Sequence, residues 1–112
     1  MKNLVNVLLI SLVISIASAF AFDNPSKTLI VFSADWCKYC QVAKYDMNYD
    51  PKVRELLKNY EVIFVDYDVD KDMVEGYNIK SIPAFIILSN GGEQDRKVGY
   101  VGGARGLQRF LK

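Results

Sequence analysis

Three short apolar runs divide the chain and predict its strands. They lie at residues 28–32, 61–66 and 84–88 and are rich in Val, Ile, Leu and Phe. Continuous apolar runs of this length are typical of strands that are buried on both faces of a sheet. The sequence SNGG at 89–92 favours a hairpin turn, so a fourth strand is expected at about 95–100, antiparallel to the third.

The segments between these runs show helical spacing of apolar residues. A first helix follows Cys40, and its inner face is expected to hold Val42, Ala43, Tyr45 and Met47. A second helix is expected to begin at Asp50-Pro51, with the aspartate as N-cap and the proline at the first helical position. Its apolar stripe consists of Val53, Leu56, Leu57 and Tyr60. Two more helices are expected at about 70–77 and 104–112.

The resulting order of elements is β-α-α-β-α-β-β-α. The first two strands are joined by a helical crossover and are therefore expected to be parallel, with a right-handed connection. The final hairpin adds two strands. We therefore predict an α/β fold: a four-stranded mixed sheet with helices on both faces.

Residues 1–21 differ from the rest of the chain. Lys2 carries the only side-chain charge in this segment, an apolar run extends from Leu4 to Ile16, and two A-x-A motifs follow at 17–19 and 19–21. This arrangement is typical of a cleavable export signal, which predicts a mature domain of residues 22–112 in an export compartment, a bacterial periplasm by preference. An uncleaved membrane anchor is the main alternative, because residues 4–22 carry no charge; a buried helix is a third.

Composition excludes several classes of function. Beyond Lys2 the chain has 13 basic and 13 acidic side chains, which gives no support for nucleic-acid binding or for a polybasic patch on a membrane surface. The chain has no histidine, so a Ser-His-Asp triad, a Cys-His pair and an imidazole metal ligand are all excluded.

The two cysteines, Cys37 and Cys40, stand where the first strand gives way to the first helix. Zinc is disfavoured, within one chain or shared between two, because two sulfurs are only half of a tetrahedral site. A static structural disulfide would close too short a loop to add much stability. A redox-active pair is favoured, because unpaired N–H groups at a helix N-terminus stabilise a thiolate and Lys38 adds a neighbouring positive charge.

The position of each cysteine predicts its role. Cys37 at the helix tip is expected to be the attacking nucleophile, and Cys40, one turn further along, the resolving cysteine. Trp36 either shields the pair or is an ordinary core aromatic residue; the sequence leaves both interpretations open.

The segments ADWCKYC at 34–40 and YNIKSIPAF at 77–85 resemble the thioredoxin superfamily. The resemblance covers about residues 27–112 and implies a thioredoxin-like fold. It further implies that Pro83 is a cis-proline facing the cysteines, that the backbone of Ile82 pairs with an extended substrate, and that Gly99 leaves room for the partner. NYDPKV at 48–53 is similar to the exported branch that includes the C-terminal domain of the periplasmic thiol:disulfide interchange protein.

Two departures from the family's pattern stand out. Reductases of this family carry a buried Asp six residues before the first cysteine and a Lys on the neighbouring strand, and the corresponding residues here are Val31 and Phe64. Water or Asp35 is then expected to take the proton of Cys40. The extra N-terminal strand and helix of thioredoxin are also missing, which indicates a minimal version of the fold.

These observations predict an exported thiol–disulfide oxidoreductase that reduces protein disulfides without a cofactor or metal. The expected partners are disulfide-containing client proteins and a membrane electron carrier that resets the cysteine pair; the chain itself is expected to be a monomer. Lys38 favours the opposite direction, a dithiol oxidant, because a stabilised thiolate makes the disulfide more oxidising. A non-enzymatic module that docks a partner protein is the alternative from another class.

Overall fold

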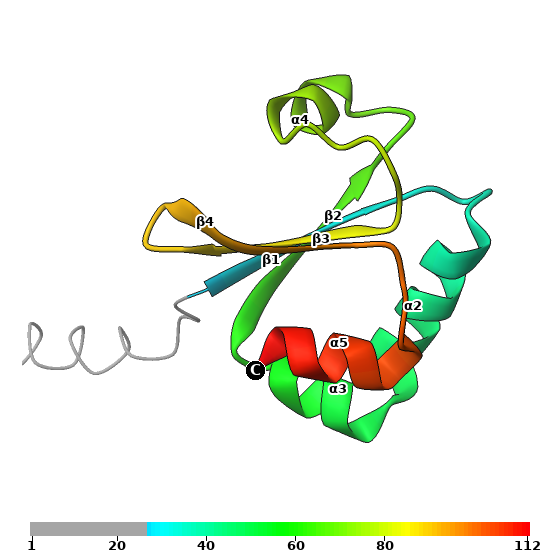
Figure 1. Ribbon diagram of the computed structural model, residues 1–112, viewed down its shortest axis with the longest axis vertical. Coiled ribbons are helices and arrows are strands. Elements are labelled where there is room, and N and C mark those ends of the chain that lie inside the picture. The colour runs from blue at the N-terminus through cyan, green and yellow to red at the C-terminus, as the bar shows by residue number, and fades with distance from the viewer. Residues whose placement is uncertain (1–26) are drawn as a thin grey trace, which may run out of the picture.

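The computed structural model describes residues 27–112 (Figure 1). The predicted signal segment at 1–21 and the predicted start of the mature domain at residue 22 lie outside the described residues. Within 27–112 no helix has the length and apolar character that a membrane crossing requires.

Eight elements follow one another in the predicted order, and the sheet is mixed and four-stranded. The strands are β1 (Lys27–Ser33), β2 (Tyr60–Asp66), β3 (Ala84–Ser89) and β4 (Gly92–Val98). The helices are α2 (Lys38–Tyr49), α3 (Pro51–Leu57), α4 (Lys71–Gly76) and α5 (Gly103–Leu111). The strand order is β2-β1-β3-β4, with β1 parallel to β2 and antiparallel to β3, and with β3 antiparallel to β4. The predicted fold class is therefore confirmed.

Helices cover both faces of the sheet (Figure 1). On one face, α2, α3 and α5 enclose a core that includes Leu29, Val31, Phe85 and Leu107. On the other face, the core includes Ile30, Phe32 and Ile86 together with Val74 of α4. Successive residues of β1 and β3 point to opposite faces of the sheet, so these two central strands contribute to both cores.

β1 and β2 have similar apolar sequences but different environments. Leu29 to Phe32 are at most 2% exposed, as predicted for a central strand. The prediction that β2 is equally buried is wrong, because Ile63 and Phe64 are 39% and 52% exposed. β2 lies at the edge of the sheet and pairs only with β1 in the described structure, so its side chains have neighbours on one side only.

The inner face of α2 differs from the prediction. Ala43 and Met47 are buried with Cys40, whereas Val42 and Tyr45 are 41% and 63% exposed. Cys40, Ala43 and Met47 are spaced three and four residues apart and form the buried stripe of the helix. Val42 and Tyr45 lie outside this spacing and therefore face solvent.

Two further boundaries differ. Tyr60 is buried, but it begins β2 rather than ending α3. β4 starts at Gly92 instead of about residue 95, because Asn90 and Gly91, both with positive φ, complete a two-residue turn after which pairing resumes at once. The predicted start of α3 is confirmed: the Val53 amide donates to Asp50 Oδ1 at 2.9 Å, and Pro51 occupies the first helical position.

Candidate active site

The cysteine pair lies at the N-terminus of α2, immediately beyond the end of β1. The Cys37 amide donates a hydrogen bond to the Ala34 carbonyl at 3.1 Å, which closes the connecting turn. Cys37 itself is the N-cap of α2: its Sγ accepts a hydrogen bond from the Cys40 amide at 3.2 Å. A sulfur in this position faces backbone N–H groups that have no partner within the helix, so negative charge on it is stabilised.

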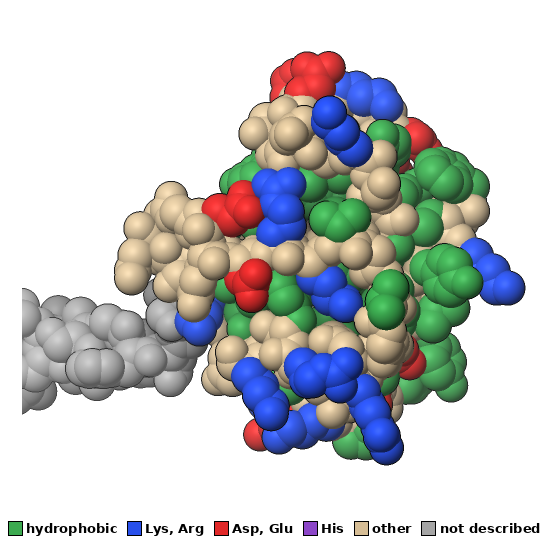
Figure 2. Space-filling model, in the orientation of Figure 1, with side chains coloured by type: hydrophobic (Ala, Val, Ile, Leu, Met, Phe, Trp, Pro, Cys, Tyr) green, Lys and Arg blue, Asp and Glu red, His purple; other side chains and the backbone are tan. Residues whose placement is uncertain are grey.

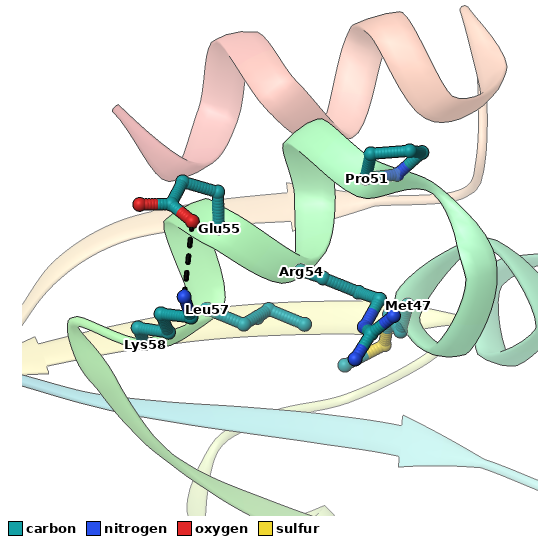
Figure 3. A pocket seen from close by; sticks show the side chains of 6 residues that line it. All are labelled: Met47, Pro51, Arg54, Glu55, Leu57 and Lys58. Atoms are coloured by element: carbon teal, nitrogen blue, oxygen red, sulfur yellow. Dashed lines mark hydrogen bonds and ion pairs between the residues drawn. The ribbon is translucent and has the colours of Figure 1, made fainter.

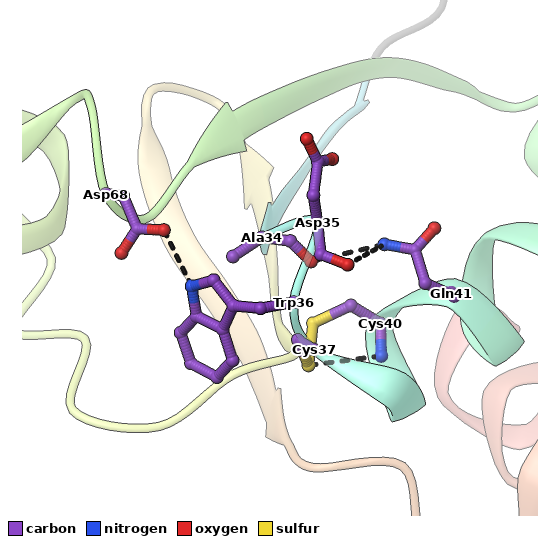
Figure 4. Close-up of a disulfide and its surroundings, with 7 residues drawn as sticks. All are labelled: Ala34, Asp35, Trp36, Cys37, Cys40, Gln41 and Asp68. Carbon is purple, nitrogen blue, oxygen red and sulfur yellow. Dashed lines mark hydrogen bonds between the residues drawn. A yellow bond between two sulfur atoms is a disulfide. The ribbon is translucent and has the colours of Figure 1, made fainter.

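Cys37 and Cys40 are joined by a disulfide, with their Cα atoms 5.2 Å apart (Figure 4). Cys37 is 7% exposed and Cys40 1% exposed. Both cysteines are therefore buried, Cys40 more completely, and the division between an attacking Cys37 and a resolving Cys40 stays a prediction.

Three residues far from the cysteines in sequence lie at the same end of the sheet. Ile82 packs against the cluster formed by Ala34 and the two cysteines, and the Ile82–Pro83 peptide bond is cis. The Gly99 amide donates to the Pro83 carbonyl at 2.7 Å. Gly99 has φ +82, and a Cβ at this position would have nothing within 4 Å, so glycine is required here by backbone conformation and not by crowding within the chain.

Trp36 is not a core residue, so the interpretation of its side chain as an ordinary core aromatic is wrong. It is 67% exposed, and its indole Nε1–H donates to Asp68 Oδ2 at 2.7 Å (Figure 4). Asp68 belongs to the turn after β2, where its amide donates to Asp66 Oδ1 at 2.9 Å. Sequence reasoning missed Asp68, because the alternating aspartates after β2 carry no signal that distinguishes one of them.

Asp35 and Lys38 are both exposed on either side of the cysteine turn. Figure 4 shows the Asp35 carboxylate directed away from the disulfide, so the described geometry does not bring it to Cys40. The turn is instead held by Gln41, whose side-chain amide donates to the Ala34 carbonyl at 3.2 Å and to the Asp35 carbonyl at 3.5 Å.

The position six residues before Cys37, where the resemblance implies a buried acid, is apolar here. Val31 is 1% exposed and pairs directly with Phe64 of β2. Lys44 of α2 lies over the Phe64 ring, with Nζ 5.6 Å from the ring centroid, a cation–π contact. A buried proton acceptor at this pair of positions is therefore absent from residues 27–112.

A cavity of about 300 Å³ adjoins the cysteine turn and is lined by Tyr39, Tyr100 and Val101. Tyr100 is held in place because its hydroxyl donates to Asp46 Oδ2 at 2.7 Å. Burial, followed by the hydrogen bond to Asp46, raises the pKa of Tyr100 above its usual value. The sequence did not single out these residues, because the seven tyrosines are scattered along the chain.

A second cavity lies at the far end of α2. It has a volume of about 550 Å³ and is lined by Met47, Pro51, Arg54, Glu55, Leu57 and Lys58 (Figure 3). None of the predicted site residues lines it. Within residues 27–112, no three Asp, Glu or Cys side chains are placed to hold a metal ion together.

Known proteins are similar to this chain in sequence and in fold. Residues 21–112 match the family model of a thioredoxin-like domain. A thioredoxin H-type of Fagopyrum esculentum is 39% identical over 82 residues, 70% of this chain and 66% of its own length. A thiol:disulfide interchange protein, the TxlA homolog of Synechocystis sp., is 37% identical over 84 residues, 70% of this chain and 43% of its own length.

Solved structures agree with this match at the level of the fold. Trxlp from Edwardsiella tarda has a TM-score of 0.66 and 23% identity, covering 86% of this chain and 91% of its own. The matched part of this chain spans less than two thirds of the length of the curated relatives above. The cysteine pair at a helix N-terminus, the cis peptide bond between Ile82 and Pro83 and these matches together show that the chain belongs to the thioredoxin-like domain family.

Proposed function

We propose that this protein is an exported thiol–disulfide oxidoreductase that reduces disulfides of client proteins through Cys37 and Cys40. The observation that carries the proposal is the disulfide at the start of α2, in which the Sγ of the less buried residue, Cys37, already accepts the Cys40 N–H. In the reduced protein the same N–H, the helix N-terminus and the Lys38 ammonium stabilise a Cys37 thiolate.

The reaction transfers two electrons from the cysteine pair to the client. The Cys37 thiolate attacks one sulfur of the client disulfide, the client S–S bond breaks, and the departing client thiolate takes a proton from solvent. Cys40, as a thiolate, then attacks Cys37 Sγ. This step breaks the mixed disulfide, releases the second client thiol and leaves Cys37 and Cys40 joined as a disulfide.

The surface around Cys37 suits an extended client segment. Ile82 precedes β3, so its backbone is outside the strand pairing and free to bond a client strand in the manner of strand addition. The exposed Trp36 side chain precedes Cys37 directly, and a client would meet no Cβ at Gly99. The proton of Cys40 passes to water, because Val31 offers no acceptor and Asp35 points away.

Turnover in the reducing direction needs a dithiol donor, which returns two electrons and two protons to the Cys37–Cys40 disulfide. In an export compartment that donor is a membrane electron carrier. The proposal of export is supported by the apolar, almost uncharged sequence of residues 1–21. Cell fractionation, together with the N-terminal sequence of the mature protein, tests it: recovery of an unprocessed chain in the cytoplasm would contradict export.

A pair of single substitutions tests the chemistry. Cys40→Ser leaves the attacking sulfur without its resolving partner, so mixed disulfides with clients accumulate and are seen as adducts on non-reducing gels. Cys37→Ser forms no such adducts and loses insulin-disulfide reduction. Adducts of equal yield with both variants would contradict the assigned roles, and an unchanged cellular phenotype of Cys37→Ser would favour a docking module over an enzyme.

The direction of electron flow is tested separately, by alkylating the cysteines in intact cells and separating the products by mass. A mostly reduced pair supports the reductase. A mostly oxidised pair would favour the dithiol oxidant, for which the Lys38 charge beside Cys37 is the supporting feature.

A further inference from the structure

The fold separates charges that are balanced in the sequence. Residues 51–58 and 103–112, which contain α3 and α5, carry six basic side chains and one acidic one. The basic residues are Lys52, Arg54, Lys58, Arg105, Arg109 and Lys112. Residues 60–77, which contain β2 and α4, show the reverse, with six acidic side chains and one basic one. The balanced composition gave no support for a basic surface patch, because composition does not show where the charges lie in the fold.

The six basic residues lie on, or directly after, two neighbouring helices, and their exposed side chains are here called the basic face. α3 and α5 pack against each other on the same side of the sheet, and Gln108 of α5 donates to Asp50 Oδ1 at the start of α3 at 3.2 Å. All six side chains are exposed. Figure 2 shows Lys and Arg side chains gathered over α5 and the adjoining rim, on the opposite side of the sheet from α4.

The basic face is scarcely neutralised from within. Two carboxylates lie on or beside α3: Glu55 pairs with Lys58 at 3.1 Å (Figure 3), whereas Asp50 accepts from the Val53 amide and from Gln108. The other ion pair among residues 27–112 joins Arg96 and Glu93 elsewhere, so five of the six cations have no carboxylate within 4 Å. Arg54 borders the 550 Å³ cavity next to Met47 and Leu57, which adds an apolar surface beside the charge.

The basic face extends to the end of the molecule at which the N-terminal segment joins. Lys27 at the start of β1 pairs with Tyr60, and the Tyr60 hydroxyl donates to the Leu111 carbonyl at 2.7 Å. The start of the described chain and the C-terminus of α5 are therefore neighbours. Cys37 follows the opposite end of β1, about 20 Å away at 3.3 Å per strand residue. Residues 4–22, which precede this junction, carry no charge.

We propose that the basic face rests on the anionic phospholipid headgroups of a membrane and leaves the cysteine end free for clients. The inference rests on the proposed export, because the membrane is the one to which residues 1–21 would direct the chain. Lys and Arg reach headgroups on long apolar stems, and attraction to anionic lipid acts within a Debye length of the surface. Binding of this kind is reversible and sensitive to salt.

Flotation with lipid vesicles tests the proposal on the chain from residue 22, since every strand pairing and every helix described lies within 27–112. Vesicles of phosphatidylcholine alone are compared with vesicles that also contain phosphatidylglycerol. The unaltered chain is expected to float only with the anionic vesicles and to be released by salt. The triple variant R105Q/R109Q/K112Q is expected to bind about a hundredfold more weakly, at roughly 1 kcal/mol per cation.

A matched variant loses the same charge from other surfaces. Lys44, Lys71 and Lys80, all outside α3 and α5, are replaced by Gln, and this variant is expected to bind anionic vesicles within about threefold of the unaltered chain. Equal losses in both variants would overturn the proposal, because net charge and not the basic face would then control binding. Equal flotation with neutral vesicles would also overturn it.

A soluble acidic polymer, polyglutamate, distinguishes a protein partner from a membrane. Binding to polyglutamate without binding to anionic vesicles would replace the membrane by an acidic protein. Insulin-disulfide reduction is measured in the same samples without lipid, and it is expected to be unchanged in both triple variants. If the R105Q/R109Q/K112Q variant loses vesicle binding but still reduces insulin, the basic face binds lipid independently of the enzyme activity. If the unaltered chain does not reduce insulin, the proposed enzyme function is contradicted, whatever the vesicles show.

Discussion

Two helices of this protein begin in the same way but with different chemistry at the first position. The N-cap of α2 is Cys37, whose sulfur accepts the Cys40 amide at 3.2 Å, and the N-cap of α3 is Asp50, whose carboxylate accepts the Val53 amide at 2.9 Å. A carboxylate is a strong, permanent cap, whereas a sulfur caps well only as a thiolate. The sulfur cap can act as a nucleophile and makes the start of α2 reactive, whereas the carboxylate cap of α3 only stabilises the helix.

The surroundings reinforce this difference. Asp50 also accepts from Gln108 at 3.2 Å, so the second helix start is tied to α5. Around Cys37 the connecting turn is exposed, and Trp36 and Tyr39 are 67% and 62% exposed. The stabilising contacts of Asp50 thus lie at the C-terminal end of α2 and the reactive cysteine lies at its N-terminal end, so each end can be altered by itself.

Replacing the reactive cap has the largest expected effect. In Cys37→Ser the hydroxyl still accepts the Cys40 amide, so the free energy of unfolding should stay within about 0.5 kcal/mol of the reduced wild type. Insulin-disulfide reduction should fall to background, because the nucleophile is gone. Denaturant unfolding measures the expected stability, and the insulin-reduction assay measures the expected loss of activity. Retained reduction would show that the reactive cap is not where the chemistry occurs.

The structural cap is expected to show the opposite behaviour. Asp50→Ala removes the acceptor for the Val53 and Gln108 donors and should lower the free energy of unfolding by about 1–2 kcal/mol. Disulfide reduction, measured well below the unfolding temperature, should change less than about twofold. Asp50→Asn is the control that keeps a capping oxygen and should recover most of the stability. If Asp50→Ala lost much of its activity without losing stability, Asp50 would not have the purely structural role described here.

Tyr100 tests the part of α2 that lies between the two caps. Tyr100→Phe removes the hydrogen bond to Asp46 and should cost about 1 kcal/mol of unfolding free energy near neutral pH. The pKa of Tyr100 is raised in the folded protein, so its neutral form contributes stability that is complete below the ordinary tyrosine pKa of about 10. That contribution should be lost as the pH rises above about 10.

Denaturant unfolding of wild type and Tyr100→Phe from pH 8 to 11 checks this dependence. The difference between the two proteins is expected to be constant at the lower end of the range and to shrink at the upper end. Tyr45→Phe, which alters an exposed tyrosine on the outer face of the same helix, serves as the control. A difference that grows with pH would contradict the assigned cause.

The smallest expected effect concerns the exposed hydrogen bond between Trp36, next to Cys37, and Asp68. Asp68→Ala removes the acceptor of the Trp36 indole and should lower kcat/KM for a protein disulfide about threefold, with the melting temperature unchanged, because the bond is at the surface. Asp72→Ala removes an equal charge from α4 and should leave kcat/KM unchanged. If both substitutions lowered kcat/KM equally, the loss of a negative charge, and not the position of Trp36, would explain the effect.

Local pattern predicted most of the fold for identifiable reasons. The Asp50-Pro51 start of α3, the turn at 89–92 and the apolar runs of β1 and β3 each depend on residues close together in sequence. The cysteine pair was equally visible, since a short C-x-x-C between a strand and a helix needs no distant partner to be recognised. Errors arose where environment depends on distant residues: β2 has a core-like sequence but lies at an edge, and Val42 and Tyr45 face solvent.

Only the tertiary structure decided which distant residues meet at the site and how the charges are distributed over the surface. Asp68 reaches Trp36, Ile82 packs on the cysteines and Tyr100 meets Asp46 across separations that no local spacing encodes. The same is true of charge: the sequence determined an even balance, but the fold places α3 and α5 together on one side of the sheet and α4 on the other. Composition is a sum over residues and carries no direction, whereas a surface potential depends on where each charge lies.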